Sequence, residues 1–261
     1  MNISRLLSVA PMMERTDRHC RYFFRLLSQQ TLLYSEMINA NAITKGNKTR
    51  LLNFSEIEHP LALQIGGSDP KLLAEATKIG VDWGYDEINL NVGCPSSRVS
   101  SGDFGAVLMK RKDHVAKCVD AMAQFSSNVP ISVKCRIAVD DQDPEKILPS
   151  FIKTVSNSGV SIFIIHARKA ILSGLSPKDN RKIPPIDYNL VKKIKAQFPQ
   201  LEICLNGEIK DLSSVMNFIN DGINGCMIGR EVYKNPSKIL ENADEKIFKK
   251  MDLSGKSKKR R

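Results

Sequence analysis

One cysteine of this sequence is distinguished by its neighbours. Cys94 follows the run 87–92, in which apolar and polar residues alternate, and it lies between Gly93 and Pro95. Such alternation is typical of a β-strand, whereas glycine and proline rarely continue a strand interior. We therefore expect the thiol where a strand gives way to a loop. There it could serve as a nucleophile, a redox-sensitive group or a proton donor.

The other five cysteines show no such setting. They are widely spaced, they form no CxxC pair, and no histidine-rich segment accompanies them. This pattern predicts free thiols in a reducing compartment, packed as small apolar side chains, and no metal site. The five residues are Cys20, Cys118, Cys135, Cys204 and Cys226.

Two further side chains that could take part in chemistry lie in or directly after apolar runs. Lys134 lies inside the run 131–136, where a lysine is costly unless it is paired, and a bound anion or an electron-rich ring would pair it. His166 follows the run 162–165. A histidine in that position is as often a hydrogen-bonded core residue as a functional one, so both interpretations stay open.

The last two apolar runs each end in a glycine with polar neighbours. Asn206, Gly207 and Glu208 follow one run, and Gly229 and Arg230 follow the other. Amides freed by glycine, a following helix and an arginine together favour an anion site. A flavin mononucleotide fits one phosphate here with its ring above Lys134 and Gln64. No GxGxxG follows the first run and no Walker sequence occurs, so no separate nucleotide domain is expected.

Eight short runs rich in Val, Ile and Leu alternate with segments of helical spacing, which predicts a TIM (β/α)₈ barrel over residues 1–240. Active sites of such barrels lie at the carboxyl ends of the strands, where polar residues here gather. Two long loops, 95–112 and the basic 168–187, leave that edge. The expected strands are 6–10, 32–37, 61–65, 87–92, 131–134, 161–166, 201–205 and 225–228, and the expected helices include 69–79, 113–125, 144–155, 189–198 and 212–219.

The formal net charge of +11 is concentrated at the carboxyl end of the chain. Between Lys246 and Arg261 eight basic residues face one acidic residue, so 8 − 1 = +7 of the charge is there. We expect residues 241–261 to form a basic, disordered tail, either merely solvated or acting as an RNA-binding arm or a nuclear import signal in a eukaryote. The sequence shows no leader and no membrane span, which favours a cytoplasmic location. We also expect a monomer.

At this point the residues resemble a known family, the tRNA-dihydrouridine synthases, and within it the subtype that modifies positions 20 and 20a of the tRNA D-loop. The resemblance covers residues 5–237, and the stretch 165–185 is its most diagnostic part. The matching segments are 8–12, 16–23, 31–37, 59–68, 89–96, 104–109, 165–170, 174–178 and 183–185.

The resemblance implies an FMN enzyme that uses NADPH to reduce the C5=C6 bond of uridine to 5,6-dihydrouridine in tRNA. It implies that Cys94 is the general acid that protonates C5, that Asn91 lies against the target base, and that Lys178 and Arg181 contact tRNA. The FMN-binding residues that it implies are Pro11, Met12, Met13, Gln64, Lys134, His166, Asn206, Gly207, Glu208, Gly229 and Arg230.

The chain departs from that family at two points. Glu208 stands where this subtype usually has glycine, and the short basic tail stands where a C-terminal helical tRNA-binding domain usually follows. The second departure leaves an alternative open, a truncated and catalytically impaired flavin- or RNA-binding remnant. A third reading is an FMN barrel oxidoreductase that acts on a small pyrimidine, but the basic loop 169–182 argues against a small substrate.

Overall fold

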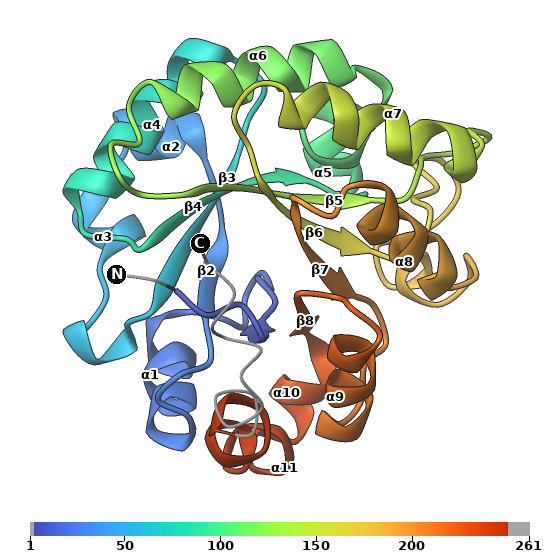
Figure 1. Ribbon diagram of the computed structural model, residues 1–261. Helices are drawn as coiled ribbons and strands as arrows, with labels where there is room; N and C mark the ends of the chain where they lie inside the picture. The colour runs from blue at the N-terminus through green and yellow to red at the C-terminus, as the bar shows by residue number, and fades with distance from the viewer. Residues whose placement is uncertain (1–2, 250–261) are drawn as a thin grey trace.

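Eight parallel strands form a barrel in the computed structural model, which describes residues 3–249 apart from the side chains of residues 97 and 98 (Figure 1). Each strand pairs with its neighbours in chain order, as a barrel requires. The strands are β1 (Leu7–Val9), β2 (Leu33–Asn39), β3 (Leu61–Gly66), β4 (Glu87–Val92), β5 (Ile131–Arg136), β6 (Ile162–His166), β7 (Glu202–Asn206) and β8 (Gly225–Ile228).

Contacts of β1 close the barrel on both sides. On one side β1 runs parallel to β8, with Val9 beside Ile228. On the other side Ser8 forms a parallel bridge with Leu32, and the Val9 amide donates to the Leu32 carbonyl at 2.9 Å. The predicted TIM-barrel architecture is therefore confirmed, with strand ends that differ from the predicted ones by no more than two residues.

Helices surround the barrel in Figure 1, and the five expected ones are present within three residues at each end. The side chain of Asp69 caps α4 and that of Asp143 caps α7, each before a proline, as their sequences predict. The helices are α1 (Arg18–Leu27), α2 (Ala40–Lys45), α3 (Lys48–Leu52), α4 (Pro70–Asp82), α5 (Ser97–Ser101), α6 (Lys112–Ala123), α7 (Pro144–Ser156), α8 (Tyr188–Gln197), α9 (Leu212–Asn220), α10 (Arg230–Lys234) and α11 (Pro236–Leu240), with 3₁₀ turns η1 (Glu56–Glu58), η2 (Gly105–Lys110) and η3 (Asp179–Arg181).

Two apolar clusters form the core. The larger one joins alternate strand residues such as Val133 and Phe163 to the inner faces of the helices, for example Phe151. The smaller one contains the other strand positions, among them Tyr34 and Ile164. Because successive side chains of a strand point to opposite faces, this second set faces the barrel interior.

The folded part of the chain continues past the boundary that we expected at residue 240. The π-helix η4 (Asp244–Lys249) buries Ile247 and Phe248, and the Asp244 carboxylate accepts hydrogen bonds from Ser28 and the Gln29 amide. Residues 241–249 thus belong to the barrel rather than to a disordered tail. The rest of the expected tail, 250–261, lies outside the described residues. Within residues 3–249 no helix is long and apolar enough to cross a membrane.

Candidate functional site

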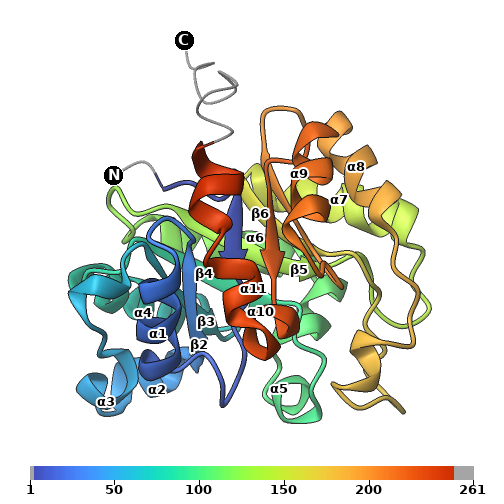
Figure 2. The same cartoon turned by 90° about the horizontal axis from the view of Figure 1, so that it is seen from below.

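The carboxyl ends of the strands bring the predicted site residues to one end of the barrel, which we call the mouth. Figure 2 shows α5 and the segment between β6 and α8 at this same end. Strand register places Arg136 beside His166, and His166 beside Asn206. Cys94 and Gly229 follow β4 and β8 at the same edge.

Hydrogen bonds hold the backbone at Cys94 from both sides. The Asn91 Oδ1 atom accepts from the amides of Gly93 at 3.2 Å and Cys94 at 3.0 Å. The Cys94 carbonyl accepts from the Ala106 amide at 2.9 Å. Gly105 has φ +75°, and a Cβ there would lie 2.6 Å from the Cys94 carbonyl oxygen, so this position requires glycine. Cys94 is half-buried. Its backbone is therefore held in place while the residue stays partly accessible.

Arg136 connects the Cys94 loop to the loop after β6. Its guanidinium donates to the carbonyls of Gly93 at 3.2 Å, Lys169 at 3.0 Å and Asn180 at 3.0 Å. Burial, and then the nearby positive charges of Arg181 and Arg168, lower the pKa of Arg136 to about 10. Arg136 thus carries positive charge beneath the thiol loop at neutral pH.

Lys134 has a neutral partner at the mouth. Its ammonium donates to Asn206 Oδ1 at 3.1 Å, and Asn206 in turn donates to the Met227 carbonyl at 2.8 Å. Burial, and then Arg136, lower the pKa of Lys134 to about 8. An anion placed beside Lys134 would compensate its charge, so the ammonium is suited to hold one.

His166 contacts the turn that follows β7. Gly207 has φ +128°, and a Cβ there would lie 2.9 Å from the His166 ring, so glycine permits this close approach. Burial, and then Arg136 and Lys134, hold the pKa of His166 well below its usual value. The imidazole is therefore neutral at physiological pH and can accept or donate a hydrogen bond.

Arginines surround Glu208 at the edge of the mouth. Arg168 pairs with the Glu208 carboxylate at 2.8 Å, and Arg230 lies 4.0 Å from the same oxygen. The Nε atoms of Arg168 and Arg181 are buried without a hydrogen-bond partner. Burial, and then Arg230, lower the pKa of Arg181. This excess of positive charge over a single contacting carboxylate could hold an anion such as a phosphate.

The segment after β1 lies next to the turn after β8. A Cβ at Gly229 would lie 3.4 Å from the Ala10 Cβ and 3.9 Å from the Met12 Sδ. Met12 packs against the core, Pro11 is partly buried, and Met13 is 55% exposed. This apolar segment therefore borders the site on the side opposite the charged loops of β5 and β6.

Two amide side chains lie below the mouth. Gln64 and Asn91 are buried, and Asn91 Nδ2 donates to Gln64 Oε1 at 2.8 Å. Asn91 was expected against an RNA base. Its Oδ1 atom and one of its N–H groups are used within the protein, which leaves its second N–H for a ligand.

The loop after β6 folds around a residue that sequence reasoning missed. The fully buried Asn180 side chain accepts from the Ile171 amide at 2.7 Å and donates to the Ile171 carbonyl at 2.8 Å. This arrangement leaves Lys178 exposed and Arg181 half-buried. The sequence gives no sign of this buried role, because an asparagine that merely forms a turn would stand in the same kind of irregular segment.

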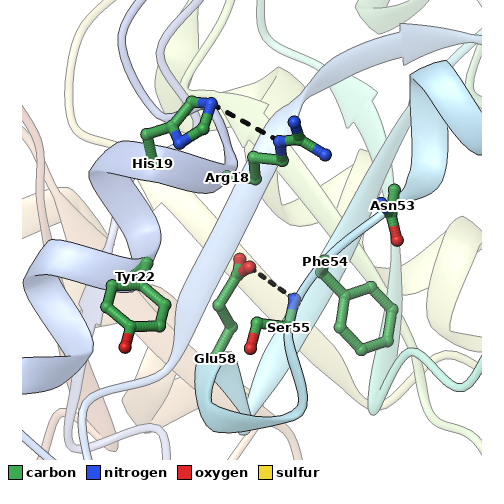
Figure 3. A pocket seen from close by; sticks show the side chains of 7 residues that line it. All are labelled: Arg18, His19, Tyr22, Asn53, Phe54, Ser55 and Glu58. Atoms are coloured by element: carbon green, nitrogen blue, oxygen red, sulfur yellow. Dashed lines mark hydrogen bonds between the residues drawn. The ribbon is translucent and has the colours of Figure 1, made fainter.

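A separate pocket of about 250 Å³ lies outside the barrel between α1 and the segment before β3 (Figure 3). Within it the Glu58 carboxylate accepts from the Ser55 amide at 2.7 Å, and it also pairs with Arg21 at 2.7 Å. None of its lining residues belongs to the mouth. They are Arg18, His19, Tyr22, Asn53, Phe54, Ser55 and Glu58.

The residues at the mouth fit a flavin mononucleotide better than a metal. Lys134, Arg168, Arg181 and Arg230 offer positive charge to a phosphate and an electron-rich ring, and two buried guanidinium nitrogens lack partners. By contrast, the described residues 3–249 contain no group of three or more His, Cys, Asp or Glu that could hold a metal ion.

Comparison with known proteins gives consistent results. The model of the family described as "Dihydrouridine synthase (Dus)" matches residues 8–260. A protein of Synechocystis sp. named tRNA-dihydrouridine(20/20a) synthase is 53% identical over 247 residues, which are 95% of this chain and 73% of that protein. The protein of the same name from Escherichia coli K12 is 54% identical over 246 residues, 94% of this chain and 70% of that protein.

Solved structures support the fold alone. Morphinone reductase in complex with tetrahydroNAD has a TM-score of 0.60 at 10% identity, covering 93% of this chain and 90% of that one. A protein described as an aldolase has a TM-score of 0.61 at 12% identity, covering 97% of this chain and 99% of that one. At such low identity the likeness extends to the barrel and not to the chemistry.

Proposed function

The chain belongs to the dihydrouridine synthase family, and from this premise we propose that it reduces uridine to 5,6-dihydrouridine at positions 20 and 20a of tRNA. The observation that carries the proposal is the placement of Cys94. Cys94 is half-buried at the mouth, Asn91 and Ala106 bond its backbone, and Arg136 bonds the carbonyl of the preceding Gly93. A fixed, accessible proton donor beside an anion-binding site is what such a reduction needs.

FMN would be held by the residues that line this mouth. Arg230 and the turns at Gly207 and Gly229 would hold its phosphate, with Asn206 and Glu208 in the same turn. Lys134, His166 and Gln64 would face its ring or ribityl chain, and Pro11, Met12 and Met13 would lie along it. When bound, reduced FMN supplies the hydride that adds to C6, and NADPH is the proposed source of that hydride.

Cys94 would supply the proton that completes the reduction. Its S–H bond breaks as a C5–H bond forms, and the thiolate then recovers a proton from solvent. Arg136, below the Cys94 loop, carries a positive charge that would stabilise the transient thiolate. The remaining N–H of Asn91 would orient the base by donating to a carbonyl oxygen.

The tRNA would meet the exposed edge of the mouth. A uridine within folded RNA must leave its stack to reach Cys94, which calls for an open rim rather than a closed cavity. Lys178 and Arg181 on the loop after β6 would contact phosphates of the RNA. The cytoplasmic location and the monomeric state stay predictions.

Reconstitution tests this proposal directly. We expect the purified protein to bind FMN, and we expect NADPH to bleach the absorbance of the bound flavin. The protein should then form dihydrouridine in tRNA from cells that lack the modification, as measured by mass spectrometry. RNA that stays unreduced with a flavin-loaded, NADPH-reducible protein would refute the proposed activity. It would favour the alternative, a flavin- or RNA-binding remnant without turnover.

A further inference from the structure

The interior of the barrel contains a continuous chain of hydrogen-bonded side chains beneath Cys94. It runs across β4, β5 and β3 through residues that share the inward face of their strands, since Glu87, Asn89 and Asn91 alternate along β4. All of its members are buried, between 0% and 7% exposed. In order from the end of the barrel opposite the mouth, which we call the closed end, they are Glu87, Ser132, Asn89, Gln64 and Asn91.

The closed end of this chain fixes the direction of its hydrogen bonds. The Glu87 carboxylate pairs with Arg5 at 2.7 Å and accepts from Tyr34 at 2.6 Å. A carboxylate can only accept, so the Ser132 hydroxyl donates to it. The Ser132 oxygen must then accept from its other partner, which is Asn89 Nδ2 at 2.7 Å.

The same direction continues to the mouth. With its nitrogen turned to Ser132, Asn89 presents its oxygen to Gln64 Nε2 at 2.8 Å. Gln64 therefore presents its oxygen to Asn91 Nδ2, also at 2.8 Å. Asn91 is left with its oxygen towards the amides of Gly93 and Cys94, which can only donate. Both ends of the chain thus demand the same orientation of all three amides.

We propose that Glu87, Ser132 and Asn89 are positioning residues that set the orientation of Gln64 and Asn91 and thereby hold the Cys94 loop in its working geometry. The inference deepens the proposed function and rests on it for the role of Cys94. Without the acceptor at Glu87, only the Gly93 and Cys94 amides would oppose a 180° rotation of the three side-chain amides, a rotation that places an N–H of Asn91 against these two donors. A misplacement of that kind would displace the proton donor.

Hydrogen exchange tests the positioning role independently of turnover. In the wild-type protein we expect the amides of Gly93 and Cys94 to be protected, although they belong to a loop. Loop-like exchange of these two amides in the unmutated protein would overturn the proposal, whatever the variants do. In Ser132→Ala, which removes the link to Glu87, we expect them to exchange roughly three- to tenfold faster.

Matched variants separate positioning from general loss of stability. Asn89→Ala interrupts the same chain one step nearer the mouth and should give the same change in exchange. Ser132→Thr keeps the hydroxyl and should restore wild-type exchange. Ser126→Ala removes a buried hydroxyl that donates to the Ala123 carbonyl and takes no part in this hydrogen-bond network. It should leave the exchange rates of the Gly93 and Cys94 amides unchanged. Equal effects of Ser126→Ala and Ser132→Ala would overturn the proposal.

Kinetics distinguish a failure of this inference from a failure of the proposed function. In Ser132→Ala we expect kcat for dihydrouridine formation to fall about ten- to a hundredfold, with the KM for tRNA unchanged. A Ser132→Ala protein with wild-type kcat and wild-type exchange refutes the positioning role only. An inactive wild-type protein with protected Gly93 and Cys94 amides refutes the proposed function only.

Discussion

The buried cations at the two ends of the barrel have different partners. At the closed end Arg5 is paired with the carboxylates of Glu87 at 2.7 Å and Glu202 at 3.3 Å. At the mouth Lys134 and Arg136 donate to neutral oxygens, and Glu208 is the carboxylate that contacts Arg168. A buried charge is costly unless it is compensated. Compensation comes from within the protein at the closed end, whereas at the mouth we propose that a bound anion supplies it.

The largest expected difference between the two ends is the loss of folding stability when a carboxylate is removed from each. Glu87→Ala leaves Arg5 with one fewer buried partner, and we expect the free energy of unfolding to fall by about 3–5 kcal/mol. Glu208→Ala at the partly exposed mouth should lower it by about 1 kcal/mol or less, because Arg168 also donates to the carbonyls of Lys182 and Pro184. Denaturant unfolding measures both. Equal losses would contradict the comparison.

Removing a cation from the mouth should affect ligand binding and leave folding unchanged. We expect Arg230→Ala to weaken FMN binding by about 1.5–3 kcal/mol, roughly ten- to a hundredfold, since it deletes a charged partner of the phosphate. Its unfolding should stay near wild type, because Arg230 is partly exposed. Calorimetric titration of FMN measures the effect, with Lys153→Ala on the outer helix α7 as the control. Unchanged affinity in Arg230→Ala would place the phosphate elsewhere.

The lowered pKa of Lys134 predicts a pH-dependent affinity. Below about pH 8 the ammonium is charged and attracts an anionic ligand, and above it the amine is neutral. FMN binding should therefore weaken by up to about tenfold as pH rises from 7 to 9.5, where the phosphate and His166 do not titrate. Lys134→Met should bind FMN weakly and with no such pH dependence. A wild-type profile that is flat over this range would contradict the assignment.

The exposed rim should give the smallest effect. Lys178→Ala removes one phosphate contact, so tRNA affinity should fall a few-fold, and the slope of log affinity against log salt should decrease by about 1. Filter binding at several salt concentrations measures this slope. Lys78→Ala, an exposed lysine of α4, is the control and should leave the slope unchanged. An identical slope in both variants would remove Lys178 from the RNA contact.

The sequence predicts much of the fold because parallel barrel strands are buried on both faces. Their continuous apolar runs, as in 162–165, are therefore easy to recognise. Strand ends shift by a residue or two because the ladder can continue into polar residues such as Arg136. Residues at these ends were correctly placed at the mouth. The C-terminal boundary at 240 was wrong, because Ile247 and Phe248 pack through tertiary contacts that local charge conceals.

The interior polar chain was missed for a different reason. In the sequence, Glu87, Asn89 and Asn91 are the polar half of an alternating strand, and of the three only Asn91 was given a role, against the target base. In a closed barrel that half faces inward, so three polar residues at spacing two predict a buried network. Ser132 on β5 shares this inward face with Lys134. The pairing across strands, which makes the network, depends on register and is not encoded in either segment alone.

The central claim is that Cys94 at the mouth donates the proton that reduces uridine. A single-turnover reaction of flavin-loaded, NADPH-reduced protein with unmodified tRNA tests it most directly, with dihydrouridine measured by mass spectrometry. We predict that Cys94→Ala forms dihydrouridine about 10²- to 10⁴-fold more slowly than wild type, whereas Cys118→Ala, which removes a buried thiol of α6, does not. Equal rates for wild type and Cys94→Ala at equal flavin content would contradict the claim.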